Sequence, residues 1–248
     1  MSELNPEYED QLIENKRLAS WEREQMMENY LPYNFYGRSY GDYENSIGLS
    51  TGLIGTFIDG LPSERRFALD VGADTSALRK VNIAGVAIGL FDPRSYQRRN
   101  LVDDDLKANR HMIVADVLSS LTWIELESKM QKFGFAEGFP LVTMVPECGL
   151  RQLTQNPRIH FDLLNRLWSV LNPLQGLMVV ELEEKAVLSP SDNSNLFKLP
   201  IFEIIKQNKW NSVLKEHGID GQLVKGGFIL ERSRQSPDTL PSIPNLTR

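Results

Sequence analysis

The sequence predicts an α/β fold: a doubly wound, mostly parallel sheet that ends in a C-terminal antiparallel hairpin and follows an N-terminal helical extension. Three observations predict it. Short, nearly continuous apolar runs recur along residues 61–234, and such runs are typical of strands buried on both faces of a parallel sheet. Amphipathic segments with helix start and stop signals lie between these runs. A Gly-Gly pair separates the last two apolar runs.

The elements follow in order along the chain. The predicted parallel strands are residues 67–72, 86–91, 111–115, 139–145 and 177–181. The predicted helices between and after them are residues 122–134, 159–171 and 201–218, each with apolar residues at helical spacing and a breaker at its end. Residues 221–224 and 228–232 flank the Gly-Gly pair, which predicts a hairpin.

The chain divides into three parts by composition: an extension over residues 1–60, an α/β domain over residues 61–234 and a tail over residues 235–248. Residues 1–28 form a predicted polar helix, and the tail is rich in Pro and Ser, like a loose linker. Between residues 29 and 60, tyrosines alternate with glycines. This pattern has two interpretations: a lid that packs against something flat, or tyrosines that seal the flank of the domain.

Composition favours a cytoplasmic protein without a metal centre. The 248 residues have a net charge of −6 and are 41% hydrophobic, with one cysteine and three scattered histidines. No apolar run is long enough to span a membrane, and the acidic N-terminus does not resemble a secretory signal. A basic group around Arg94, Arg98 and Arg99 is followed by three aspartates at 103–105. We expect these charges to form a solvated helix face, and we do not expect nucleic acid as a partner.

Acidic residues follow the first three predicted strands. Asp70, Gly72, Ala73 and Asp74 close the first strand, Asp92 comes 20 residues after Gly72, and Asp116 ends the third strand. A carboxylate after the second strand suits the two vicinal hydroxyls of a ribose. An acid after the third strand suits the exocyclic amine of adenine, with the next backbone N–H, that of Val117, donating to a ring nitrogen. Together these strand ends predict an adenosine pocket.

Each acid also has a local interpretation. Asp92 precedes Pro93 and is a candidate helix cap, Asp74 is a candidate cap of a helix at Thr75, and Asp116 is a candidate turn residue. The loop after the first strand has one glycine and an added carboxylate, whereas a pyrophosphate requires a glycine-rich loop. Asp74 would repel a phosphate, so the sequence favours a nucleoside with a cationic sulfonium over NAD or FAD.

These motifs resemble those of the class I S-adenosylmethionine-dependent methyltransferases, which have a Rossmann-like sheet. The resemblance covers residues 61–232. The first three family motifs are similar to Leu69-Asp70-Val71-Gly72, Gly89-Leu90-Phe91-Asp92 and Ala115-Asp116-Val117-Leu118-Ser119. The fourth strand and its following loop, with Val145 and Pro146, resemble the part of the family site that faces the transferred methyl group. The sequence departs from the family in its loop, which keeps only Gly72.

The resemblance implies S-adenosylmethionine as cofactor and methyl transfer to a small-molecule or protein acceptor. Glu147, in the loop after the fourth strand, is a candidate base for an acceptor that must lose a proton, although a solvent-facing acid is an equal alternative. Tyr33, Tyr36 and Tyr40 are candidates to cover the acceptor as part of a lid. The alternatives are a methyltransferase-like protein without catalysis that binds a partner, and, with less support, an RNA methyltransferase or an NAD-dependent oxidoreductase.

Overall fold

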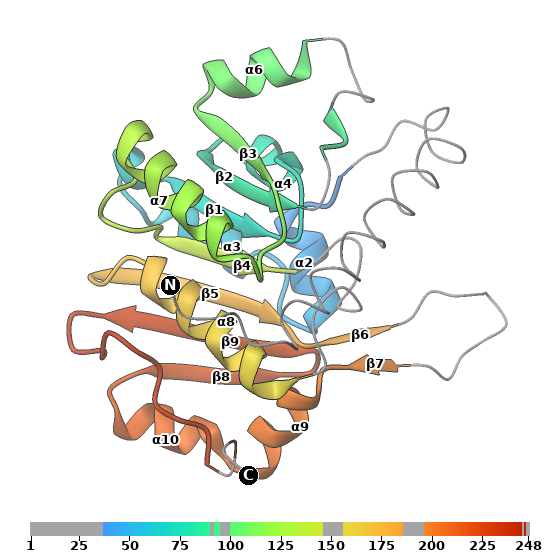
Figure 1. The fold of residues 1–248 in the computed structure, drawn as a ribbon, viewed down its shortest axis with the longest axis vertical. Helices are drawn as coiled ribbons and strands as arrows, with labels where there is room; N and C mark the ends of the chain where they lie inside the picture. Colours follow the sequence, from blue (N-terminus) through green and yellow to red (C-terminus); the bar gives the residue numbers. More distant parts are fainter. Residues whose placement is uncertain are drawn as a thin grey trace, which may run out of the picture.

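The computed structural model describes residues 37–89, 92–94, 100–145, 156–185, 196–244 and 246. Its main sheet has seven strands in the order β3-β2-β1-β4-β5-β9-β8 (Figure 1). The strands are β1 (Phe67–Val71), β2 (Ala84–Gly89), β3 (Arg110–Val114), β4 (Leu141–Met144), β5 (Gln175–Glu181), β8 (Asp220–Val224) and β9 (Gly227–Ser233). Strands β1 to β5 are parallel, and β9 inserts antiparallel between β5 and β8. This is a methyltransferase-like Rossmann fold, so the predicted α/β sheet with its C-terminal antiparallel hairpin is confirmed. The helix predicted over residues 1–28 lies outside the described residues.

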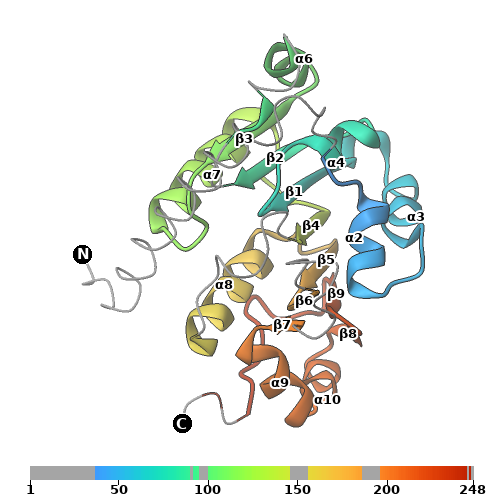
Figure 2. The same ribbon diagram turned by 90° about the vertical axis from the view of Figure 1, so that its right-hand side faces the viewer.

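Helices cover both faces of the sheet (Figure 2). Helices α7 (Ser120–Phe133) and α8 (Pro157–Val170) pack on one face, and α2 (Tyr40–Ile47), α3 (Leu53–Asp59) and α4 (Ser76–Lys80) lie on the other. Short 3-10 helix η1 (Ser63–Arg65) precedes β1, and α6 (Leu101–Lys107) precedes the edge strand β3. The β strands between them contribute side chains to two buried clusters, one on each face. Because both faces of the sheet are buried, the sequences of these strands are nearly continuous apolar runs.

The region after β5 differs from the sequence prediction. A two-stranded ribbon, β6 (Glu183–Lys185) and β7 (Leu196–Lys198), follows β5 and was not predicted. The helix predicted over residues 201–218 is instead two helices, α9 (Pro200–Gln207) and α10 (Trp210–Glu216). Lys209 between them has a left-handed φ of 49°. The break redirects the chain and places the Trp210 side chain in the core.

Residues 40–59 form two helices that belong to the core. Ser39 caps α2, and Asp42 completes a capping box with it. The buried carboxylate of Glu44 accepts hydrogen bonds from the backbone amides of Gly52 and Ile54 and so caps α3, both at 2.5 Å. Tyr40 and Tyr43 are buried in the cluster beneath these helices. These two tyrosines therefore seal the flank of the domain, which was the second of the two interpretations.

The prediction of a loose C-terminal linker is wrong for the described part of residues 235–248. Leu240, Ile243 and Leu246 are buried in the larger cluster. The indole N–H of Trp168 donates to the carbonyl of Pro237 at 2.9 Å, and that of Trp210 donates to Pro241 at 3.0 Å. A buried indole requires an acceptor, and the tail supplies one to each. The tail thus fastens α8 to α10.

Candidate functional site

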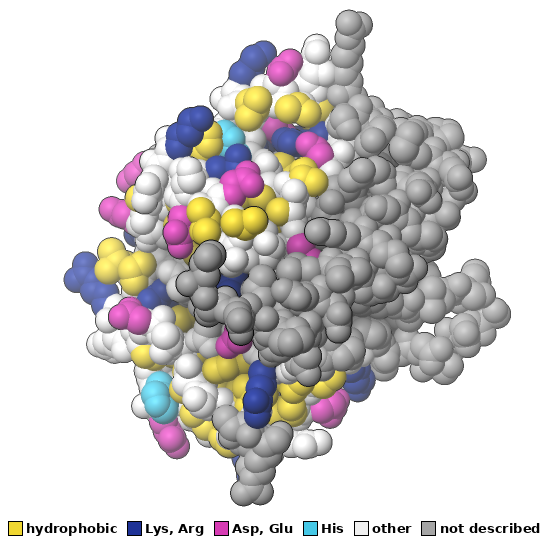
Figure 3. All heavy atoms as spheres, viewed as in Figure 1, with side chains coloured by type: hydrophobic (Ala, Val, Ile, Leu, Met, Phe, Trp, Pro, Cys, Tyr) yellow, Lys and Arg dark blue, Asp and Glu magenta, His cyan; other side chains and the backbone are white. Residues whose placement is uncertain are grey.

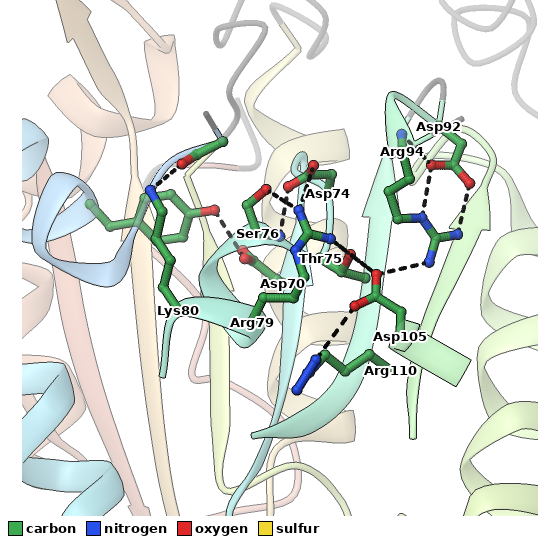
Figure 4. A network of polar contacts seen from close by, with 12 residues as sticks. Asp70, Asp74, Thr75, Ser76, Arg79, Lys80, Asp92, Arg94, Asp105 and Arg110 are labelled. Atoms are coloured by element: carbon green, nitrogen blue, oxygen red, sulfur yellow. Dashed lines mark hydrogen bonds and ion pairs between the residues drawn. The ribbon is translucent and has the colours of Figure 1, made fainter. Parts of the chain in front are cut away.

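Three of the predicted site acids lie at the carboxyl edge of neighbouring parallel strands. Asp70 is the second-last residue of β1, Asp92 follows β2 and Asp116 follows β3. The register pairs Asp70 with Ala87 and Gly89 with Val114, so the three strand ends lie side by side. Ligands of doubly wound sheets bind at this edge. Figure 4 shows Asp70 and Asp92 with the charged residues that surround them.

The loop after β1 packs closely against β2. Gly72 has a left-handed φ of 82°, a conformation that favours glycine. The backbone amides of Gly72 and Ala73 both donate to the carbonyl of Ile88, at 2.7 and 3.3 Å. A Cβ on Gly89 would lie 2.8 Å from the carbonyl oxygen of Ala73, so a glycine is needed there too. Because these two amides point at β2, they cannot form the first part of a phosphate cradle.

Each of the acids that follow the strands forms the same kind of local turn. The carboxylates of Asp74, Asp92 and Asp116 each accept a hydrogen bond from the amide two residues further on, at 2.7, 3.0 and 2.9 Å. This Asx turn ends the preceding strand and directs the chain away from the sheet. The turn interpretation of Asp116 is therefore correct. Helix α4 begins at Ser76 with Thr75 at its N-cap position, so Asp74 does not cap a helix at Thr75. Residues 95–99, which would form the helix capped by Asp92, lie outside the described residues. The roles of the three acids toward a nucleoside remain predictions.

Asp70 is fully buried beneath α2. Its carboxylate accepts hydrogen bonds from the hydroxyls of Tyr43, at 2.9 Å, and Thr143 of β4, at 2.7 Å. Burial, and then the charge of Asp70, raise the pKa of Tyr40 well above its ordinary value. No hydrogen-bond partner for the Tyr40 hydroxyl exists among the described residues. Asp70, two residues before Gly72, is therefore a buried carboxylate held by side chains of α2 and β4.

Asp92 is bound by Arg94 through both carboxylate oxygens. Oδ1 accepts from Nε at 2.8 Å and from the backbone amide at 3.0 Å, and Oδ2 accepts from Nη2 at 2.7 Å. Burial raises the pKa of Asp92, but the hydrogen bonds and charge of Arg94 outweigh burial and hold this pKa below its ordinary value. Asp92 is therefore a carboxylate at neutral pH, held in one orientation by a planar guanidinium.

The expected solvated face over Arg94 and the three aspartates is wrong for Arg94 and Asp105, which are buried. The Asp105 carboxylate contacts three guanidiniums, those of Arg79 at 3.0 Å, Arg94 at 3.2 Å and Arg110 at 3.5 Å (Figure 4). The sequence held a weak signal. Asp105 lies four residues after the buried Leu101, on the same face of α6, whereas Asp103 and Asp104 are exposed.

Asp74 has a different electrostatic environment from the one predicted. Asp74 is 2% exposed, and the guanidinium of Arg79 lies 3.6 Å from its carboxylate. Its charge is balanced inside the protein rather than presented to a ligand. The orientation of the Gly72 and Ala73 amides toward Ile88 gives an independent reason why this loop does not suit a pyrophosphate.

The chain that enters α2 lies against the same loop. A Cβ on Gly37 would lie 2.0 Å from the Ser76 hydroxyl and 3.0 Å from a carboxylate oxygen of Asp74. The Lys80 ammonium donates to the carbonyl of Gly37. Sequence reasoning did not connect these segments, which are about 40 residues apart. The first described residues of the chain therefore form one wall of the loop.

Of the remaining predicted site residues, some lie within the described part of the chain and some lie outside it. The Val117 carbonyl accepts from the Trp123 indole at 2.8 Å, while its amide has no acceptor among the described residues. Val145 directly follows β4 and is buried. Pro146, Glu147 and Tyr36 lie outside the described residues, so their predicted roles stay predictions.

The described residues contain neither a metal-binding cluster nor a membrane-spanning helix. No group of three or more His, Cys, Asp or Glu side chains in this part of the chain is arranged to hold a metal ion. No helix in it combines the length and apolar character needed to cross a membrane.

Comparisons with known proteins add little to this geometry. No protein-family model matches the sequence, and no curated protein matches it. One solved structure to which the chain is similar is that of an O-methyltransferase family protein from Burkholderia thailandensis. The two share 10% sequence identity with a TM-score of 0.38, over 91% of this chain and 72% of that chain. The strand order and strand directions, rather than this similarity, define the fold.

Proposed function

We propose that this protein is an S-adenosylmethionine-dependent methyltransferase that acts on a small-molecule or protein acceptor. One observation carries the proposal. A single edge of a methyltransferase-like sheet collects the Gly72 loop, the Asp92 carboxylate, and Asp116 with the Val117 amide. These are the groups that an adenosine requires at successive strand ends.

The described residues fit an adenosine cofactor that carries no phosphate. The Val117 amide has no acceptor among these residues, which supports its proposed role as a donor to a ring nitrogen. The Gly72 and Ala73 amides are bound to Ile88, so this loop offers no anion cradle there.

In the proposed mechanism Asp92 binds the ribose hydroxyls, and Asp116 and Val117 bind the adenine edge. The cofactor supplies an electrophilic methyl group on a sulfonium. The chain contributes mainly by positioning, because methyl transfer is an in-line displacement that depends on the alignment of donor and acceptor. We propose Glu147 as the base when the acceptor must lose a proton, and Tyr36 as part of the acceptor cover.

The acceptor class rests on charge. The chain is acidic, at −6. On the face shown in Figure 3, basic and acidic side chains of the described residues are interspersed. A polyanionic acceptor is normally met by a basic patch, so a small molecule or protein side chain is favoured over RNA.

Calorimetric titration with S-adenosylmethionine and S-adenosylhomocysteine tests the proposal. We expect saturable binding of both. Asp92→Ala removes charge-assisted hydrogen bonds to the ribose, each worth about 1.5–3 kcal/mol, and should weaken both ligands by at least about tenfold. Asp103→Ala, which removes an exposed carboxylate from α6, is the control and should bind like the unaltered protein. Absence of binding by the folded, unaltered protein would refute the proposal.

A second candidate, a methyltransferase-like binding protein without catalysis, is favoured by the Asp92 contacts. Oδ1 already accepts two hydrogen bonds from Arg94, and Oδ2 accepts a third. A ribose that places one hydroxyl on each oxygen must compete with this guanidinium. Binding of S-adenosylmethionine without formation of S-adenosylhomocysteine across an acceptor screen would support this candidate.

A further inference from the structure

We propose that Asp105 is a positioning residue that aligns the two halves of the cofactor pocket, the loop after β1 and the turn after β2. This inference rests on the proposed function. Asp105 comes from α6, outside both halves, and its side chain is fully buried. Its carboxylate contacts both halves directly, so one side chain sets their separation (Figure 4).

The first arm runs from Asp105 through Arg94 to Asp92. Nη1 of Arg94 donates to Asp105 at 3.2 Å, and Nε and Nη2 donate to the two oxygens of Asp92. A guanidinium is planar, so the hydrogen bond to Asp105 restricts the plane in which the other two nitrogens meet Asp92. Asp105 therefore determines the orientation of the Asp92 carboxylate, which is the proposed ribose acceptor.

The second arm runs from Asp105 to the loop after Gly72. The Thr75 hydroxyl donates to Asp105 at 2.6 Å, and Nη1 of Arg79 donates to it at 3.0 Å. Nη2 of Arg79 then donates to the Ser76 hydroxyl at 2.7 Å and lies 3.6 Å from Asp74. Asp105 therefore also holds the loop after Gly72. We assign the methionine part of the cofactor to this loop, because the ribose and adenine are assigned to the ends of β2 and β3.

A third contact anchors the network to the sheet. Arg110 of β3 contacts Asp105 at 3.5 Å and donates to the carbonyl of Ile83 at 3.0 Å and to the side chain of Asn82 at 2.9 Å. The charges balance, because three guanidiniums face the carboxylates of Asp74, Asp92 and Asp105. Removal of the Asp105 carboxylate leaves three arginines close together, and the two arms lose the one side chain that both of them contact.

Binding of two ligands distinguishes the contributions of the two arms. Adenosine needs only the Asp92 side, whereas S-adenosylhomocysteine also needs the loop after β1. We expect Arg94→Gln to weaken both ligands by a similar factor of about ten, since each loses the oriented carboxylate. We expect Arg79→Gln to weaken S-adenosylhomocysteine and leave adenosine unchanged. Asp105→Asn should weaken both, and Arg94→Lys, which keeps the charge without the fork, should recover only part of the loss.

The control is Asp103→Asn, which removes an exposed carboxylate from the same helix and should change neither affinity. Melting temperatures identify variants that do not fold. If Asp105→Asn does not fold, the affinities of Arg79→Gln and Arg94→Gln for the two ligands are sufficient to test the inference. Equal losses for both ligands in both arginine variants, or unchanged binding in folded Asp105→Asn, would overturn the inference.

Hydrogen exchange without ligand keeps this test separate from the proposed function. If the unaltered protein binds neither ligand, the proposed function fails, yet the arms still predict a measurable effect. Asp105→Asn should then exchange faster than Asp103→Asn in peptides covering residues 72–80 and 92–94, because both segments lose their anchor. Unchanged exchange in both segments would overturn the positioning role itself.

Discussion

At the scale of single residues, His160 shows how burial makes stability depend on pH. It lies in the first turns of α8 and is 2% exposed, and its Nε2 has no hydrogen-bond partner among the described residues. Burial lowers the pKa of His160 from 6.5 to about 4. The folded protein thus holds a neutral imidazole while the unfolded chain binds a proton between these two pH values. This contribution to stability is complete above pH 6.5 and is lost as the pH falls to about 4.

We expect His160→Leu to reduce the loss of unfolding free energy between pH 7 and pH 5 by roughly 2 kcal/mol. Leucine has no proton to gain on unfolding and leaves no unpaired nitrogen in the core. Urea denaturation at the two pH values measures this difference. His217→Gln, at an exposed site after α10, is the control. An unchanged pH dependence in His160→Leu would show that burial of His160 is not its source.

At the scale of elements, the ends of helices decide where the chain turns. Helix α7 ends at Gly134, which has a φ of 86° and whose amide donates back to Met130. A Cβ there would meet nothing within 4 Å, and neither would a Cβ on Gly55 inside α3. Backbone conformation alone therefore separates these two glycines, since space is available at both.

We expect the same substitution to have opposite effects at the two positions. Gly134→Ala should lower the unfolding free energy by about 1–2 kcal/mol, because a Cβ disfavours the left-handed conformation. Gly55→Ala should raise it by about 0.5–1 kcal/mol, because glycine is entropically costly inside a helix. Thermal melts should show opposite shifts of about 2–4 °C per kcal/mol. Shifts of the same sign would contradict this explanation.

At the scale of the whole molecule, the tail connects elements that are far apart in sequence. Beyond its two indole contacts, the tail amide of Leu240 donates to the side chain of Asn165 in α8 at 2.9 Å. Arg232 of β9 donates to the carbonyls that end α8, those of Trp168 and Leu171, and to the carboxylate of Asp238. The end of the chain is thus part of the core that supports β5 and β9.

We expect Leu240→Ala to lower the unfolding free energy by about 2–5 kcal/mol, as for other buried leucines. Leu121→Ala is the matched control, because Leu121 is 72% exposed on α7, and it should change stability by less than about 0.5 kcal/mol. Urea denaturation measures both. Equal, small effects would mean that the tail is the loose linker that its composition suggests.

The sequence by itself determined the type and order of most elements and the position of the acids at the strand ends. These features are local: apolar runs, breakers and turn residues act over a few positions. It did not predict the β6–β7 ribbon or the break at Lys209. The ribbon strands are three residues each, too short to show a periodic pattern.

Only the tertiary structure decided which partner each charged group has. Asp105 contacts Thr75, 30 residues away, and Arg79, 26 residues away. In the sequence, Asp105 stands in an acidic run that is typical of a solvated helix. Its burial depends on how α6 packs beside the sheet, and the free energy of a buried carboxylate depends on the guanidiniums that the fold brings to it. Such long-range pairings have no local signature, so the sequence located the edge of the site and the fold determined its electrostatics.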